Sequence, residues 1–234
     1  LLLMTWRGHP DEKDEPQHFR MGKILTSLLA LLDIPFVIAD KDPEKMEVAF
    51  KHASAHFAQH KKPFAILFQK KVIESIDSLP KPVLDPSLQT RESILKHIID
   101  NSTPQDVIIT TTGKTSRECF ELREAKKQAH GCDFLTVGSM GCASSIALGV
   151  AMQQPKKRVI LIDGDGACLM RLENLATIGH VSPPNLLHIL IDNAAYESTG
   201  GQATLSSTVN FPDVATACGY GTSIRCDAIS DLTP

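Results

Sequence analysis

The chain has 234 residues, of which 24 are Lys or Arg and 27 are Asp or Glu, and its formal net charge is −3. Hydrophobic residues make up 42% of the chain and charged residues 22%, which is ordinary for a globular protein with one large or two modest domains. The near-neutral charge, the single Trp and the two Tyr give no reason to expect nucleic acid or an anionic membrane as a partner, and no apolar run is long enough to span a bilayer.

The six cysteines include no CxxC pair and no paired Cys and His spacing, which argues against a zinc site or a disulfide framework. We therefore expect free and mostly buried thiols in a protein of a reducing compartment, the cytoplasm.

Alternating strand and helix patterns fill the first 70 residues. The sequence predicts a buried strand at 1–4, a polar loop at 5–19, helices at 23–32 and around 46–57, and strands at 35–39 and 63–68. The loop carries Arg7, His9 and His18, whose side chains can bind an anionic phosphonate or carboxylate. On composition alone, an ordinary solvated loop is the alternative.

A charged, proline-containing stretch at residues 71–88 has no periodicity and is predicted to be a linker. The loop that follows a predicted strand at 106–110 includes Thr112 and Gly113, which suit phosphate oxygens, and then Lys114, either a phosphate partner or a plain surface lysine. Further elements are predicted as a helix at 90–99, a strand, loop and small-residue helix over 133–151, and a last strand at 222–226.

The chain is organised around residues 159–202. A β-branched run at 159–162 predicts a buried strand, and Gly164, Asp165 and Gly166 follow it as a tight turn. An amphipathic helix over 169–178 and a strand at 186–191 complete a β-α-β unit that ends at Asn193. Because open parallel sheets bind ligands at the carboxyl ends of their strands, Asp165 and Asn193 are expected to share a site.

The chemistry of that site follows from the residue types. Asp165 offers a carboxylate and Asn193 an amide oxygen, which are hard ligands suited to Mg²⁺, and a polyanion is needed to complete the metal's coordination. Ser198 and Thr199 supply hydroxyls for a diphosphate, and we expect them at a helix start. Gly-Asp-Gly alone is a weak signal, because such turns are common on protein surfaces.

Gly164-Asp165-Gly166 followed by Asn193 resembles the signature of the thiamine-diphosphate-dependent enzymes. Residues 6–18, 111–118 and 196–202 resemble, in the same order, stretches of the phosphonopyruvate decarboxylases and related sulfopyruvate decarboxylases of that family. The resemblance implies an α/β fold with two Rossmann-like cofactor-binding domains and parallel sheets. They would be part of a pyrimidine-binding domain at 1–70 and a diphosphate-binding domain at 89–234.

The resemblance also implies a fragment that begins inside the first domain and ends inside the second. The glutamate that activates the cofactor in this family is expected outside the given sequence, since Glu12 and Glu15 lie in the wrong loop. We therefore expect the chain by itself to turn over little or not at all.

The resemblance assigns roles residue by residue. Asp165, Asn193 and the backbone carbonyl of Ala195 would bind Mg²⁺ on the cofactor's diphosphate. Met140 would serve catalysis by holding thiamine in a V shape, and Gly138 would offer its carbonyl to the aminopyrimidine ring. The remaining cofactor contacts are expected from Thr112, Gly113, Gly164, Gly166, Ala167, Ser198 and Thr199, and substrate contacts from Arg7, His9 and His18.

The implied reaction is decarboxylation of a 2-oxo acid, with the cofactor as electron sink. Phosphonopyruvate is the expected substrate, in a homo-oligomer whose subunits share cofactor sites. The alternatives are sulfopyruvate or another 2-oxo acid as substrate, ligation of two 2-oxo acids, or a truncated form that binds cofactor without turnover. A nucleotide-binding module is a further alternative, although it would place a GxGxxG loop directly after a strand and the sequence has none.

Overall fold

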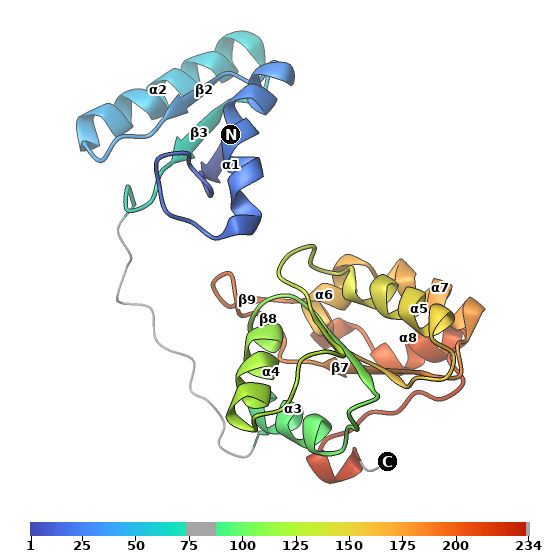
Figure 1. The fold of residues 1–234 in the computed structure, drawn as a ribbon. Helices are drawn as coiled ribbons and strands as arrows, with labels where there is room; N and C mark the ends of the chain where they lie inside the picture. The colour runs from blue at the N-terminus through green and yellow to red at the C-terminus, as the bar shows by residue number, and fades with distance from the viewer. Residues whose placement is uncertain (74–87, 233–234) are drawn as a thin grey trace. The chain divides into compact units, whose positions relative to one another are not determined.

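A computed structural model of the chain describes residues 1–73 and 88–232. The chain divides into two compact units, residues 1–83 and 84–234, and both contain parallel strands connected by helices (Figure 1). The predicted α/β class with parallel sheets is therefore confirmed. The predicted linker at residues 71–88 lies largely outside the described residues.

The first unit has one three-stranded parallel sheet. Its elements are β1 (Leu2–Thr5), α1 (Pro16–Leu31), β2 (Phe36–Ile38), α2 (Pro43–His60) and β3 (Ala65–Phe68). The strand order is β1-β3-β2, and the central strand, β3, is buried along its whole length. Ile66 and Phe68 pack against α2, whereas Ala65 and Leu67 pack with residues of α1, because successive side chains of a strand point to opposite faces.

Two predictions in this unit are wrong in detail. The strand predicted as buried at residues 1–4 is β1, an edge strand that pairs with β3, and Leu3 is 59% exposed. The loop predicted at 5–19 is shorter, because Pro16 begins α1. The first helical position leaves its N–H unbonded, so proline is favoured there as well as in loops. His18 therefore lies in a helix.

The second unit is built on a four-stranded parallel sheet. Its first elements are α3 (Arg91–Asp100), β4 (Val107–Thr110), α4 (Lys114–Ala125), β5 (Asp133–Leu135), α5 (Ala143–Gln153), β6 (Val159–Gly164) and β7 (Leu186–Ile191). The strand order is β5-β4-β6-β7. Ile160 and Ile162 of β6 belong to the core formed with α3 and α4, and Val159 and Leu161 pack with the alanines of α5 on the opposite face (Figure 1).

The single helix predicted over residues 169–178 is two helices, α6 (Asp165–Met170) and α7 (Glu173–Val181). The tight turn predicted from Gly164 to Gly166 is also wrong, since Gly164 ends β6 and Asp165 begins α6 directly. The two helices have different partners: α6 contacts β6 and β7, whereas α7 contacts α5 and α8 (Phe211–Ala217). One straight helix could not satisfy both sets of contacts.

After β7 the chain turns back as a hairpin of two short antiparallel strands, β8 (Ala195–Tyr196) and β9 (Gln202–Ala203). Ser198 and Thr199 lie in the turn of this hairpin and not, as predicted, at a helix start. Gly200 and Gly201 have φ angles of 133° and 74°, which glycine adopts most readily, and they favour the turn. Residues 222–226 form no strand. Elsewhere in the described residues there are two 3-10 helices, η1 (Ser206–Thr208) and η2 (Ile229–Asp231).

Among the helices in the described part of the chain, none combines the length and the apolar character needed to cross a membrane.

Gly179 and Gly149 form a matched pair that tests the packing of the second unit. A Cβ on Gly179 in α7 would lie 1.9 Å from the backbone oxygen of Cys218, beside α8, whereas a Cβ on Gly149 in α5 would meet open space. We expect Gly179→Ala to destabilise the fold by about 1–3 kcal/mol through overpacking. Gly149→Ala should stabilise it by about 0.5–1 kcal/mol. Urea unfolding measures both changes, and equal effects would contradict the close contact of α7 with α8.

Candidate functional site

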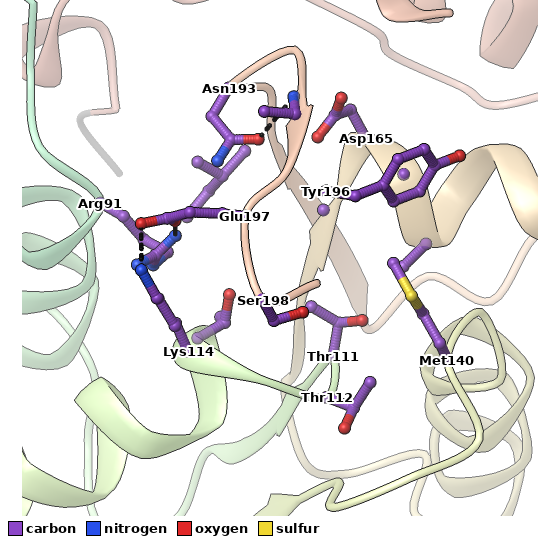
Figure 2. Close-up of a pocket in the computed structure, with 16 residues that line it drawn as sticks. Arg91, Thr111, Thr112, Lys114, Met140, Asp165, Asn193, Tyr196, Glu197 and Ser198 are labelled. Carbon is purple, nitrogen blue, oxygen red and sulfur yellow. Dashed lines mark hydrogen bonds and ion pairs between the residues drawn. The ribbon is translucent and has the colours of Figure 1, made fainter. Parts of the chain in front are cut away.

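A pocket lies at the carboxyl ends of β4, β6 and β7, within the second unit (Figure 2). Its lining comes from the start of α3, the connection from β4 to α4, the loop before α5, the junction of β6 with α6, and the hairpin after β7. These segments are far apart in the sequence. They meet because strands of a parallel sheet all end at the same edge.

Asp165 is buried in this pocket, with 2% of its surface exposed. Burial raises the pKa of its carboxyl group, and the negative charge of Asp192 raises this pKa further. The Thr204 hydroxyl donates a hydrogen bond to the carboxylate, which acts against the increase. Backbone N–H groups of Gly166 and Asn193 also favour the charged form. No Lys, Arg or His in the described part of the chain forms an ion pair with Asp165, so this charge lacks a compensating cation.

The turn after β7 carries the other two predicted metal ligands. Ala194 has a φ of 54°, a left-handed conformation that is uncommon for alanine, and it places Asn193 and Ala195 on either side of a sharp turn. The Oδ1 atom of Asn193 accepts a hydrogen bond from the Ala195 N–H at 3.2 Å, and an amide oxygen has a second lone pair. Both residues line the pocket with Asp165, so the three predicted ligands are brought together.

Thr111 presents an unsatisfied hydroxyl group to the pocket. The residue is buried, and its Oγ1 atom has no hydrogen-bond partner among the described residues. Buried hydroxyls without partners are uncommon and unfavourable, so the position favours a ligand that brings a hydrogen-bond acceptor. Thr112 lines the same wall. Gly113 is the N-cap residue of α4, and its φ of 97° favours glycine.

Four charged side chains form an ion-pair network at one side of the pocket. Figure 2 shows Arg91, Lys114 and Glu197 of this network. The Arg91 guanidinium donates to both carboxylate oxygens of Glu118, at 2.8 and 2.6 Å, and to Glu197 at 2.5 Å. Lys114 donates to the other carboxylate oxygen of Glu197. The hydrogen bond from Arg91, followed by that from Lys114, lowers the pKa of Glu197. The network therefore connects the starts of α3 and α4 to the hairpin.

Met140 lies across the pocket from this network (Figure 2). It belongs to the loop between β5 and α5, where Ser139 and Gly141 have positive φ angles of 53° and 88°. The residue is half-buried, so it is an element of the pocket wall and not of the hydrophobic core. Gly138 lies in the same loop but does not line the pocket.

The structure gathers most of the predicted cofactor and metal residues into this pocket. Gly113, Gly138 and Thr199 do not line it, and the Thr199 hydroxyl donates to the carbonyl of Tyr196 in its own turn at 3.2 Å. The predicted residues that do line the pocket are Thr112, Met140, Gly164, Asp165, Gly166, Ala167, Asn193, Ala195 and Ser198.

Several residues of the site were missed by sequence reasoning. Tyr196 packs so closely on α6 that a Cβ on Gly166 would lie 2.4 Å from its ring, which explains why a glycine occupies that position. Tyr196 lies in a stretch that carries the family resemblance, and so could have been identified. Arg91 and Thr204 gave no signal in the sequence, because their partners are distant along the chain.

Arg7, His9 and His18 belong to the first unit. The Arg7 guanidinium donates two hydrogen bonds to Asp14, at 2.9 and 2.7 Å, and so holds its own loop together. The Nε2 atom of His9 lies 2.9 Å from the side-chain amide nitrogen of Gln69, and His18 lies in the first turn of α1. A substrate role for these three residues stays a prediction.

Comparison with known proteins identifies the family of this chain. Residues 111–234 match the family described as thiamine pyrophosphate enzyme, C-terminal TPP binding domain. The whole chain is 36% identical to a phosphonopyruvate decarboxylase of Streptomyces viridochromogenes and 37% identical to one of Streptomyces hygroscopicus. It spans only 61% and 60% of the length of these two proteins.

Over 56% of its length, the chain is 40% identical to a sulfopyruvate decarboxylase subunit beta of Methanocaldococcus jannaschii. This match covers 68% of that protein. The family resemblance predicted from the sequence is thereby confirmed. The chain belongs to the thiamine pyrophosphate enzymes, with their C-terminal cofactor-binding domain in residues 111–234.

Proposed function

We propose that this chain supplies the thiamine diphosphate and Mg²⁺ site of a 2-oxo acid decarboxylase that acts on phosphonopyruvate. The observation that carries the proposal is the buried carboxylate of Asp165, which has no compensating cation in the described part of the chain. It shares its pocket with Asn193, Ala195 and the unsatisfied hydroxyl of Thr111.

The residues of the pocket fit a divalent ion that is bound together with a diphosphate. A carboxylate, an amide oxygen and a backbone carbonyl are hard oxygen donors, and Mg²⁺ completes its octahedral coordination with phosphate and water. A cation would compensate the charge of Asp165, and a diphosphate oxygen would accept the hydrogen bond that Thr111 does not make with the described residues. Thr112 and Ser198 add two further hydroxyls to the same wall.

When bound, thiamine diphosphate supplies an electron sink for the carbon atom that loses CO₂. In the proposed reaction, the bond between the carboxylate and the ketone carbon of the 2-oxo acid breaks, CO₂ leaves, and a proton takes its place to give an aldehyde. The residues of this chain bind and orient. Asp165, Asn193 and Ala195 would hold the metal and the diphosphate, and Met140, across the pocket, would support the thiamine portion.

Phosphonopyruvate is favoured over sulfopyruvate by similarity across both units. The two phosphonopyruvate decarboxylases match the whole chain at 36% and 37% identity. A sulfopyruvate decarboxylase of Methanosarcina acetivorans matches 97% of the chain but is 28% identical. The loop with Arg7 and His9 lies in the first unit, and the three subunit beta proteins match 49% to 56% of the chain. Sulfopyruvate stays the second candidate, because sulfonate and phosphonate accept hydrogen bonds from similar donors.

We place this activity in a cytoplasmic assembly of more than one chain. The six cysteines carry free thiols, which suits a reducing compartment, but only Cys119 and Cys168 are buried, so the prediction of mostly buried thiols is wrong. Three of the similar sulfopyruvate decarboxylase chains are named as subunit beta, which supports an assembly of several chains.

Calorimetric titration of the chain with thiamine diphosphate, with and without Mg²⁺, tests the cofactor assignment. We expect saturable binding that requires the metal, and no binding in Mg²⁺ would contradict the assignment. Incubation with phosphonopyruvate or sulfopyruvate in parallel, in a protein that carries the full length of the relatives, then tests the substrate. Phosphonoacetaldehyde is the expected product, and turnover of sulfopyruvate alone would select the second candidate.

Asp165→Asn tests the metal ligand without disturbing the fold. The variant should lose at least about 100-fold in Mg²⁺-dependent affinity for thiamine diphosphate. Its melting temperature should stay equal or rise, because the buried uncompensated charge is removed while the amide oxygen still accepts from Thr204. Asp192→Asn is the matched control: it makes the same charge change at an exposed neighbour and should bind within about threefold of the natural sequence. Retained affinity in Asp165→Asn would show that Asp165 is not a ligand.

Met140→Ala tests whether this residue positions the cofactor or only packs. In a protein with measurable decarboxylase activity, we expect kcat to fall by about 10- to 100-fold, because small misplacements of reacting groups are costly. The unfolding free energy should fall by less than the roughly 2–5 kcal/mol typical of a core methionine, since Met140 is half-buried. Met140→Leu keeps the bulk and should retain most activity. A stability loss in the core range with unchanged kcat would assign Met140 to packing.

A further inference from the structure

The positive charges in the pocket lining are already neutralised within the protein. Arg91 and Lys114 are the cationic residues among those that line it in the described part of the chain. Arg91 is paired with Glu118 and Glu197, and Lys114 is paired with Glu197. The two cations and the two carboxylates of this network therefore cancel in formal charge.

The remaining charge near the pocket is negative. Asp165 lines it and is buried, and Asp192 lies close enough to raise the pKa of Asp165. A diphosphate that enters alone would meet these carboxylates without a free cation to attract it, and charge repulsion is stronger in a partly buried site than in water. A divalent cation reverses this balance, because it binds the carboxylate and the diphosphate together.

From this arrangement we infer that Glu197 makes diphosphate binding depend on the metal. Its carboxylate accepts hydrogen bonds from Lys114 and from the Nη1 atom of Arg91. These two cations would otherwise attract a polyanion directly. The inference rests on the proposed function, since it concerns how the same pocket binds its cofactor. Glu197 thus acts through Arg91 and Lys114: because it neutralises both cations, it removes an alternative, metal-free way of binding.

The hairpin that carries Glu197 has other supports, so the role of its charge can be tested separately from its role in folding. The β8 and β9 strands pair with each other, the Thr204 N–H donates to the Ala194 carbonyl at 3.0 Å, and the Thr204 hydroxyl is bound to Asp165. Glu197→Gln keeps the shape of the side chain and one acceptor oxygen for Arg91 or Lys114. It removes the negative charge and replaces the other acceptor oxygen with an NH₂ group.

The experiment compares thiamine diphosphate binding in EDTA and in Mg²⁺ by calorimetry, for the natural sequence and for Glu197→Gln. The natural sequence should bind in Mg²⁺ only. Glu197→Gln should gain measurable binding in EDTA. The ratio of its dissociation constant in EDTA to that in Mg²⁺ should be lower than that of the natural sequence by at least about tenfold. Its affinity in Mg²⁺ should stay within about threefold of the natural sequence, and its melting temperature should be nearly unchanged.

Two further variants complete the test. Adding Lys114→Met to Glu197→Gln should abolish the metal-free binding, because it removes the freed cation. Glu173→Gln makes the same charge change in the exposed ion pair of Arg171 with Glu173, which does not line the pocket, and should leave the metal dependence unchanged.

The outcomes separate the inference from the proposed function. If Glu197→Gln still fails to bind in EDTA, or loses affinity in both conditions together with its melting temperature, then Glu197 only holds the hairpin and the inference is wrong. If the natural sequence itself does not bind thiamine diphosphate in Mg²⁺, the proposed function fails, and the inference fails with it.

Discussion

The carboxylate of Asp165 is held at the end of β6, 2% exposed, and it has hydrogen bonds but no cation as partners in the described part of the chain. Such a charge is unfavourable in a folded protein unless something compensates it, because burial removes the water that would stabilise it. The surrounding chain reduces this penalty with the Thr204 hydroxyl and with backbone N–H groups, but none of these carries a positive charge. The buried negative charge is therefore uncompensated, and a divalent cation would compensate it.

The parallel sheet of the second unit is what brings the components of this site together. Parallel pairing places β4, β6 and β7 side by side, and their carboxyl ends bring Thr111, Asp165 and Asn193 to one edge of the sheet. Each supplies a different function: a hydroxyl without a partner, a buried charge and an amide oxygen. The ion pairs of Glu197 then connect the hairpin to α3 and α4, which completes the wall of the pocket.

The proposed cofactor contacts and the proposed substrate contacts belong to different units. The second unit holds the groups that suit a metal and a diphosphate, whereas the loop with Arg7 and His9 belongs to the first. In that loop, Asp14 is almost fully buried and accepts hydrogen bonds from Arg7 and from the Gly8 N–H. This bonding gives the loop a defined conformation, and it uses a guanidinium that the sequence had offered for substrate binding. Any contact of Arg7 with an anionic substrate would have to be made in addition to this pair.

The sequence by itself determined the elements that depend on local pattern and the ligands that depend on residue type. The apolar runs became β3, β4 and β6, and the carboxylate and amide at Asp165 and Asn193 lie together as the order of the strands required. The tertiary structure alone decided the break between α6 and α7, because their packing partners are remote in the sequence. It also decided the burial of Asp165 and the pairing of Arg91 with Glu197, for the same reason: charge compensation and desolvation depend on distances in space, which neighbouring residues along the chain do not encode.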